Sequence, residues 1–209
     1  MEPLYEDNHL LVVNKPAGLL VQGDKTGDRT LLDEAKAYLR QRHNKPGKVY
    51  LGLVHRLDRP VSGIVVLART SKAASRLSEE IRAGRMEKEY IALVEGRLPD
   101  QGDWTDQLKR EDQHSRVAEP GEAGKQARLT FTCLERKKGF CRVRIQLITG
   151  RHHQIRVQFA HRGHPVLGDV RYGSSMPFPD RCLALHAAQV AVKHPVRPEK
   201  LVFAAPPDW

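Results

Sequence analysis

The chain has 209 residues, enough for one domain with a substantial buried core. Lysine and arginine number 35 against 25 aspartate and glutamate residues, which leaves a net charge of +10 at pH 7 with histidine neutral. Such an excess favours a polyanionic partner, because each phosphate that a cation neutralises releases counterions. A basic surface that only aids solubility is the weaker interpretation, because aromatic and histidine residues are interleaved with the charges. We therefore expect a nucleic-acid partner.

The cysteines and apolar runs argue against several other classes of protein. Cys133, Cys141 and Cys182 are odd in number, widely spaced and without a CxxC pair, which disfavours a secreted disulfide scaffold and a zinc ribbon. No signal-peptide pattern is visible, and no apolar run approaches the roughly 20 residues that span a bilayer. The expectation is a cytoplasmic protein with no membrane partner.

The N-terminal part of the chain predicts two strands and a helix. Residues 10–13 are apolar and predict a buried strand, and a turn at residues 15–18 leads into residues 19–22, which together predict a hairpin. Thr30 is a good N-cap for an amphipathic helix that ends before Pro46.

The central elements follow the same logic. Residues 51–54 and 64–67 are rich in aliphatic and β-branched side chains and predict buried strands. Ser71 is expected to cap a second helix, with Gly84 just past its end. Residues 90–95 predict a further strand.

Residues 98–124 are polar, and we interpret them as an excursion in the form of a hairpin. Its basic members are Lys109, Arg110 and Arg116. Acidic neighbours nearly cancel their charge, so a nucleic-acid contact there is disfavoured. These neighbours are Asp103, Asp106, Glu111 and Asp112.

Two alternating stretches, residues 129–133 and 141–147, predict an antiparallel pair with one apolar and one basic face. A turn at residues 136–139 joins them. Strands outnumber helices and often follow one another directly, so strict strand–helix alternation fails. The predicted fold class is α+β.

The candidate chemistry centres on four residues, HRLD, that interrupt the two central apolar runs. Pro60 and Gly63 mark a turn, which would display His55, Arg56 and Asp58 at the lip of a sheet. A carboxylate held beside an apolar wall can serve catalysis. The alternative is that Asp58 only forms a structural ion pair with a neighbouring arginine.

Together with a second stretch, HRLDRPVSG resembles the RluA-type family of RNA pseudouridine synthases. That second stretch is GRHHQIRVQFAHRGHPVLGDVRYG, which is similar to the family's pattern GRTHQIRxHLxxxGHPVLGDxxYG. LLVVNKPAGLLV near the start is similar to the family's first motif, and MEKEYIALVEG carries its Lys-x-Tyr as Lys88 and Tyr90. The C-terminal LALHAAQVAVKHPV and LVFAAPPD match as well. The resemblance runs from about Leu10 to Pro206, with residues 98–124 outside it.

The resemblance implies a pseudouridine synthase fold over residues 1–209 as a single catalytic domain, with a mixed, mainly antiparallel sheet, flanking helices and loops, and a central cleft. It implies isomerisation of uridine to pseudouridine, which changes no net redox state and needs no cofactor and no metal. Asp58 matches the family's catalytic aspartate. Whether Asp58 attacks a carbon atom or accepts a proton stays open.

The resemblance also assigns roles to other residues. Arg156 matches an arginine that would keep Asp58 ionised by gripping it bidentately, with phosphate binding as its alternative role. Tyr90 would stack on the uracil, with core packing as its alternative. Arg56 is expected to act as a wedge or phosphate clamp for a flipped nucleotide. The remaining residues expected to contact RNA are Lys88, Arg151 and His153.

Two positions depart from the family pattern, since Val61 and His152 stand where the family usually has threonine. Because residues 149 and 150 precede a predicted helix, we expect His152 and Arg156 to share one face of it. The first motif begins at Leu10, so the chain is expected to recognise its RNA without an S4 domain. A compact stem-loop of tRNA or ribosomal RNA is the expected partner, DNA is not, and a monomer is expected.

Two other classes of function remain open. A metal hydrolase would use a cluster of histidines with Asp169, but their spacing matches no common ligand pattern. These histidines are His152, His153, His161 and His164. A non-catalytic RNA-binding protein is disfavoured, because binding a polyanion does not require a buried carboxylate such as Asp58.

Overall fold

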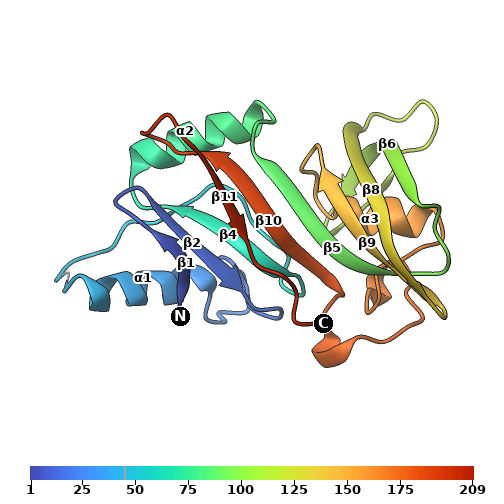
Figure 1. Cartoon of the computed structure of the whole chain (residues 1–209), viewed down its shortest axis with the longest axis horizontal. Coiled ribbons are helices and arrows are strands. Elements are labelled where there is room, and N and C mark those ends of the chain that lie inside the picture. The colour runs from blue at the N-terminus through green and yellow to red at the C-terminus, as the bar shows by residue number, and fades with distance from the viewer. Residues whose placement is uncertain (45) are drawn as a thin grey trace. The chain divides into compact units, whose positions relative to one another are not determined.

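The computed structural model describes residues 1–44 and 46–209, and leaves the side chain of Arg181 undescribed. The chain divides into two compact units. The first contains residues 1–86 and 189–209, and the second contains residues 87–188. Strand β10 (Leu185–Lys193) begins in the second unit and ends in the first, so it returns the chain to the unit where it started (Figure 1).

The first unit is built from strands in the order β1, β2, β4, β10, with β3 on β4 and β11 on β10. The pairs β1–β2, β2–β4, β3–β4 and β10–β11 are antiparallel. The first unit also contains helices α1 and α2. The elements are β1 (Pro3–Glu6), β2 (Leu10–Lys15), α1 (Leu31–Arg42), β3 (Gly52–Leu53), β4 (Ser62–Ala68), α2 (Ser71–Arg82) and β11 (Lys200–Ala204).

The first four residues of β2 are buried on both faces of the strand, which explains why they are all apolar and do not alternate. Leu10 and Val12 pack in the same core cluster as Ile64 and Val66 of β4 and Leu77 of α2. The residues between them, at positions 11 and 13, are also at most 1% exposed. Each fully buried aliphatic side chain contributes about 1.5–3 kcal/mol, so this strand is a rigid base for the loops that leave its ends.

Both helices of the first unit are capped by a threonine. Thr30 forms a capping box with Asp33, in which the side chain of each residue accepts from the other's backbone N–H, as predicted for the start of α1. Helix α2 is capped by Thr70, whose Oγ1 accepts from the N–H of Ala73 at 3.1 Å. The predicted cap, Ser71, is instead the first helical residue, so that assignment was wrong by one position.

The second unit contains an antiparallel sheet in the order β5, β9, β8, β6, β7. The polar segment predicted as an excursion forms the β6–β7 hairpin, and the two alternating stretches form β8 and β9. Both predictions are confirmed. The elements are β5 (Glu87–Glu95), β6 (Gln101–Glu111), β7 (His114–Val117), β8 (Lys125–Lys137), β9 (Phe140–Leu147), α3 (Gln154–His161), and two short 3-10 helices, η1 (Val170–Tyr172) and η2 (Pro179–Arg181).

Helix α3 is held against this sheet by an aromatic cluster. The ring of Phe159, fully buried, lies 4.7 Å from that of Trp104 and 5.6 Å from that of Phe131. Two residues closer to the N-terminus of the helix, Val157 packs with Leu108 and Ala127. Such aromatic contacts add about 0.5–1.5 kcal/mol beyond area burial, and they fix the helix whose N-terminal turn carries the candidate site residues.

The α+β class, with a mostly antiparallel mixed sheet, is confirmed by these strand pairings. The predicted hairpin of residues 10–13 with 19–22 was wrong. Strand β2 pairs with β1 and β4, and Leu20 makes only an isolated parallel bridge with Thr30. No helix in the described part of the chain is long and apolar enough to cross a membrane.

Candidate active site

Asp58 lies in the loop between β3 and β4 of the first unit, where its side chain is half-buried. Its backbone carbonyl accepts from the N–H of Val61 at 3.1 Å and closes the predicted turn. Nε2 of His55 accepts from the N–H of Val66 at 2.9 Å, which ties the start of the loop to β4. Arg56 is exposed, as its predicted contact with RNA requires.

A buried lysine anchors the same loop on its other side. Lys15 is 0% exposed, and its Nζ donates to the carbonyls of Pro16 at 3.0 Å, Leu19 at 2.8 Å and Arg59 at 3.2 Å. The carbonyl of Arg59 also accepts from the N–H of Gly18 at 2.8 Å. A buried amino group is tolerated only when its N–H groups have hydrogen-bond acceptors, so these contacts explain how the Lys15 side chain can be buried. They hold the residue directly after Asp58.

Arg156 lies in α3 of the second unit and is 5% exposed. Its Nε lies 2.6 Å from Oδ2 of Asp169, and its Nη2 lies 2.8 Å from Oδ1. Asp169 is 1% exposed, so this bidentate ion pair is almost fully removed from water. The guanidinium also lies 5.0 Å from the ring centroid of Tyr172. Two groups therefore orient this one cation.

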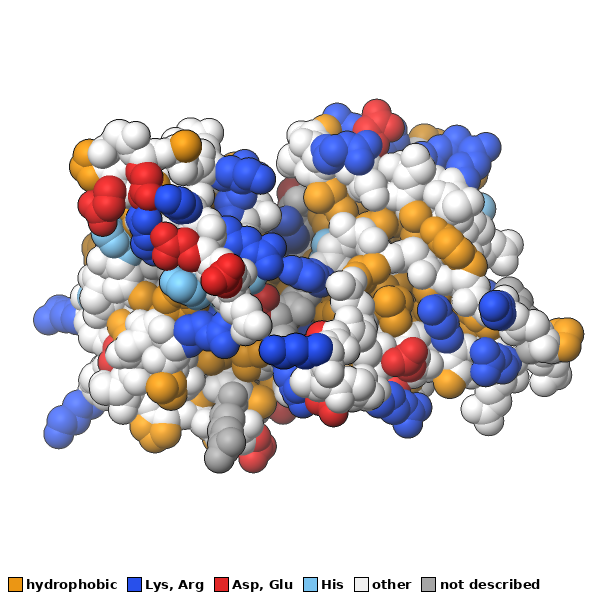
Figure 2. Space-filling view, turned by 180° about the vertical axis from the view of Figure 1, so that it is seen from behind, with side chains coloured by type: hydrophobic (Ala, Val, Ile, Leu, Met, Phe, Trp, Pro, Cys, Tyr) orange, Lys and Arg blue, Asp and Glu red, His pale blue; other side chains and the backbone are white. Residues whose placement is uncertain are grey.

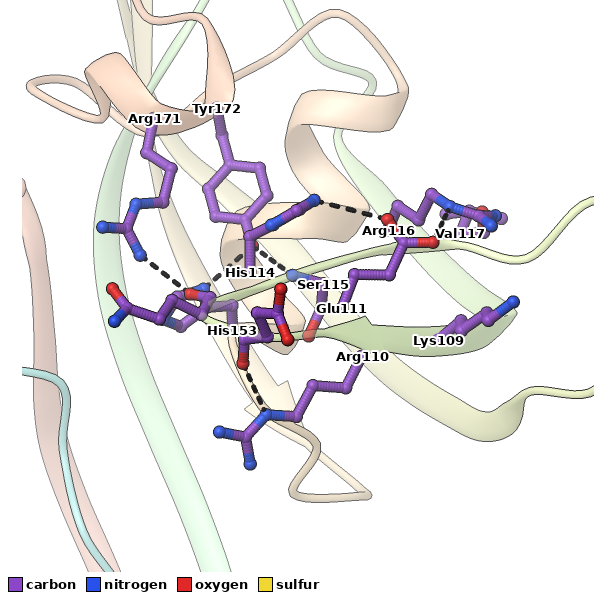
Figure 3. Close-up of polar contacts among 12 residues, drawn as sticks. Lys109, Arg110, Glu111, His114, Ser115, Arg116, Val117, His153, Arg171 and Tyr172 are labelled. Atoms are coloured by element: carbon purple, nitrogen blue, oxygen red, sulfur yellow. Dashed lines mark hydrogen bonds and ion pairs between the residues drawn. The ribbon is translucent and has the colours of Figure 1, made fainter.

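The hydroxyl of Tyr172 connects three elements. It accepts from the N–H of Ser115 in β7 at 2.9 Å and lies 2.8 Å from Nδ1 of His153 (Figure 3). Burial raises the pKa of the Tyr172 hydroxyl, so it remains protonated at neutral pH. His153 has a left-handed backbone with φ of 54°, and its ring stacks on that of His152 at 3.8 Å. This conformation directs the predicted RNA-contact residue His153 toward Tyr172.

Tyr90 and Lys88 are two residues apart in β5 and therefore lie on one face of that strand. Tyr90 is 8% exposed and lies opposite Ile145 of β9. Lys88 is half-buried, and burial lowers the pKa of its ammonium group. A methyl group added to Gly150 would lie 3.0 Å from Nζ of Lys88. The Lys88 ammonium thus lies beside the loop that leads into α3.

The structure brings several predicted residues together within the second unit. Lys88 lies beside Gly150, and Arg151 and His153 precede the helix that carries Arg156. His152 also lies before that helix, so the prediction that it shares a helical face with Arg156 was wrong. Its Nδ1 lies 3.0 Å from Oγ of Ser115 instead. The predicted grip of Arg156 on Asp58 joins the two units and stays a prediction, as does the central cleft.

Sequence reasoning missed four residues that support this geometry. Lys15 was assigned only to a turn, Asp169 was considered only as a metal ligand, and Ser115 and Tyr172 received no role. The available signal was the run LGDVRYG, which places a carboxylate and an aromatic ring shortly after α3. Because their contacts with Arg156 and β7 are made through folding, the run alone does not name the partners.

The histidines of the metal-hydrolase alternative have separate contacts. His164 lies with Nδ1 2.9 Å from the carbonyl of Glu95, while His152 and His153 contact Ser115 and Tyr172. Asp169 is engaged by Arg156. Across residues 1–44 and 46–209, no three or more histidine, cysteine, aspartate or glutamate side chains are grouped so that they could hold a metal ion.

The family model described as RNA pseudouridylate synthase matches residues 9–161 of the chain. The chain belongs to this family. Its members isomerise uridine to pseudouridine in RNA. The match spans the Asp58 loop, Tyr90 and Arg156, so the candidate residues of both units fall within the family's own domain. Asp169 and Tyr172 lie beyond the matched range.

Relatives and solved structures agree with this membership. The chain is 35% identical over its whole length to the ribosomal large subunit pseudouridine synthase D of Xylella fastidiosa and spans 67% of that relative. It is 34% identical to the uncharacterized RNA pseudouridine synthase YhcT of Bacillus subtilis, with 99% of the chain and 68% of the relative aligned. The solved human RNA pseudouridylate synthase domain containing 4 has a TM-score of 0.80 at 24% identity, covering 98% of this chain and 87% of the human one. That likeness shows the shared fold.

Proposed function

We propose that this pseudouridine synthase modifies specific uridines in a structured stem-loop of tRNA or ribosomal RNA. It acts in the cytoplasm as a monomer, with residues 1–209 as one catalytic domain and without a cofactor. Relatives named for the ribosomal large subunit support an RNA substrate of this kind. The net charge of +10 supports a polyanion, and the basic side chains interleaved with histidines on the second unit support the same partner (Figure 2, left).

The reaction breaks the bond between C1′ of the ribose and N1 of uracil and forms one between C1′ and C5. The proton lost from C5 is balanced by the one gained at N1, so no oxidant or reductant is consumed. What the protein must supply is a carboxylate at the glycosidic bond, a surface that holds the free base, and exclusion of water. Asp58 supplies the carboxylate in our proposal, as nucleophile or as proton acceptor.

The anchoring of the Asp58 loop is the observation that carries this proposal. Hydrogen bonds from Lys15 to Arg59 and from Val66 to His55 hold the loop on both sides of Asp58. A carboxylate that must act at one carbon atom needs this kind of rigid support. A residue that only contributed to a surface ion pair would not need it.

Arg156 and Tyr90 complete the proposed site. Arg156 supplies a cation that cannot lose its proton, and its contacts with Asp169 and Tyr172 keep its orientation constant. Tyr90 supplies a flat ring for the uracil, where stacking is worth about 1–3 kcal/mol. The exposed Arg56 occupies the space of the flipped nucleotide or clamps its phosphate, which offsets part of the few kcal/mol that flipping costs.

The test is pseudouridine mapping on total RNA from cells that lack the gene, complemented by wild type, Asp58→Ala or Asp24→Ala. Asp24 is an exposed carboxylate of the same unit whose Oδ1 accepts from the backbone N–H of Thr26, so it is a matched control. We expect wild type and Asp24→Ala to restore the same few sites and Asp58→Ala to restore none. RNA affinity, measured by filter binding, should be retained in Asp58→Ala.

Restoration of the modification by Asp58→Ala would reject the catalytic assignment. If no site changes in the deletion strain, another enzyme of the cell could modify the same uridines. Pseudouridine formation by the purified protein on tRNA and ribosomal RNA then tests the activity directly. RNA binding without pseudouridine formation in that assay would favour a non-catalytic RNA-binding protein.

A further inference from the structure

The second unit contains a pocket of about 520 Å³ between the β6–β7 hairpin, the start of β8 and the loop before α3. Most of the residues that line it lie outside the sequence motifs of the family. None of the described residues that line it carries a carboxylate. Its polar side chains come from Lys109, Arg110, Ser115, Lys125, Arg151 and His152.

The carboxylates of Glu111 and Glu122 are paired with cations other than Arg110, Lys125 and Arg151. Arg116 contacts both Glu111 and Glu122, and Lys109 contacts Glu122 as well. These contacts leave Arg110, Lys125 and Arg151 without a carboxylate partner in the described part of the chain. Arg110 donates from Nε to the backbone carbonyl of Asp112, and Arg151 donates from Nε to that of Gln126. Figure 3 shows Arg110 and Lys109 extending in different directions from the hairpin.

The floor of the pocket is rigid and joined to the proposed site. Ser115 is 2% exposed, and its Oγ lies 3.0 Å from Nδ1 of His152. Its backbone N–H donates to Tyr172, whose ring lies under the guanidinium of Arg156. Arg151 precedes Arg156 by five residues. A group bound on this floor is therefore held at a constant separation from Arg156.

A glycine in the lining of the pocket permits a close approach of two chain segments. A methyl group added to Gly124 would lie 2.8 Å from Cβ of Gln107, closer than side-chain carbons approach without displacement. The absence of a side chain there lets the chain enter β8 tightly against β6. This brings Lys125 level with Leu108 and next to the hairpin cations.

From this arrangement we infer that the pocket binds a backbone phosphate and its ribose in the RNA substrate, a few nucleotides from the target uridine. The inference rests on the proposed function for the identity of the polyanion. Guanidinium groups present parallel N–H donors that match phosphate oxygens, and Arg110 and Arg151 both retain donors beyond their carbonyl contacts. The volume lies within the range of pockets that hold small organic groups, which suits one sugar-phosphate and not a folded protein segment.

The experiment compares the full-length chain with Arg110→Gln, Lys125→Gln, their double variant and Lys138→Gln. Lys138 follows the other end of β8, about 40 Å from Lys125, and its substitution removes the same charge outside the pocket. Dissociation constants for bulk tRNA and ribosomal RNA are measured between 50 and 300 mM salt, on the order of the range over which phosphate contacts are resolved. Pseudouridine formation at saturating RNA is measured separately.

We expect each pocket substitution to weaken RNA binding about two- to fivefold and to reduce the log–log salt slope by about 0.4, because the pocket cations share one phosphate. The double variant should reduce the slope by about 0.7–0.9, which is the whole contribution of one phosphate, while the rate at saturating RNA stays within about twofold of wild type. Lys138→Gln should change the slope by less than half as much.

Unchanged affinity and slope in the double variant would overturn the inference, as would an equal loss in Lys138→Gln or a wild-type chain that binds neither RNA. If wild type binds RNA without forming pseudouridine, the proposed function fails while the salt slopes still decide the pocket. The two failures are therefore distinguishable.

Discussion

Asp169 binds two nitrogen atoms of Arg156 at once, at 2.6 and 2.8 Å, with both side chains almost fully buried. Because Nε and Nη2 are both engaged on one edge of the guanidinium plane, the direction of the remaining nitrogen, Nη1, is determined by the carboxylate. Asp169 is therefore a positioning residue, acting on the reaction through Arg156.

Asp169→Asn should lower the free energy of unfolding by about 3 kcal/mol or more, because it leaves a buried guanidinium without its counter-charge. The rate of pseudouridine formation should fall more than the affinity for RNA. Urea unfolding and single-turnover assays measure the two effects. The matched control is Asp103→Asn, which breaks an exposed pair with Arg128 and should cost less than about 1 kcal/mol. Equal effects of the two substitutions would contradict the positioning role.

Tyr172→Phe removes the hydroxyl that Ser115 and His153 contact but keeps the ring beside Arg156. We expect a loss of about 1–3 kcal/mol of stability, because the buried N–H of Ser115 loses its acceptor. Tyr172→Leu should cause a further loss of activity, because the ring contact disappears too. Thermal unfolding measures the loss of stability, and turnover assays measure the loss of activity. A phenylalanine variant as inactive as the leucine variant would assign the role to the hydroxyl.

Lys15→Met should destabilise the chain by at least about 2 kcal/mol, because the carbonyls of Pro16, Leu19 and Arg59 all lose the donor that the buried Lys15 provides. Activity should fall in samples that remain folded, because the carbonyl after Asp58 is released. The comparison is Lys25→Met, at an exposed position, which should have little effect on either quantity. Full activity in folded Lys15→Met would show that the Asp58 loop does not need this anchor.

Asp7 predicts a specific acid sensitivity of the first unit. Burial alone would raise the pKa of Asp7, but hydrogen bonds from the N–H groups of His9 and Leu10 and from His194 overcome this and lower it to about 2. The group's contribution to stability is complete above about pH 5 and is lost as the pH falls toward about 2, because the unfolded chain then binds the proton more strongly.

Urea unfolding of wild type and Asp7→Asn between about pH 2 and 6 tests this sensitivity. This range includes the pKa of Asp7 in both the folded and the unfolded chain. The wild type should lose about 1–2 kcal/mol of stability relative to the variant across the window. Parallel curves for the two proteins would mean that Asp7 has the same pKa in the folded and unfolded chains.

Several elements could be predicted from local patterns because short-range physics decides them. The capping box at Thr30, the alternation that forms β8 and β9, and the continuous apolar run of β2 each depend on neighbouring residues and burial. The family could also be assigned from its motifs. The hairpin at residues 10–22 failed because strand pairing depends on long-range competition, and β4 and β1 are the better partners for β2.

The charges of the β6–β7 hairpin illustrate the other limit. Counted along the sequence, its acidic and basic residues nearly cancel. In the folded hairpin, Glu111 and Glu122 contact Arg116 and Lys109, which leaves Arg110 to line a basic pocket with Lys125 and Arg151. A sum of charges carries no information about which ions pair, because pairing depends on register and on side-chain direction.

Residue identity was therefore sufficient to name the family, the α+β class and the candidate residues Asp58, Tyr90 and Arg156. Only the tertiary structure decided that Lys15 anchors the Asp58 loop and that Asp169 orients Arg156. The reason is physical. A motif specifies chemical groups, whereas the partners of a buried charge come from segments that are distant in the sequence. Those partners are needed because a charge removed from water is costly unless it is paired or hydrogen-bonded.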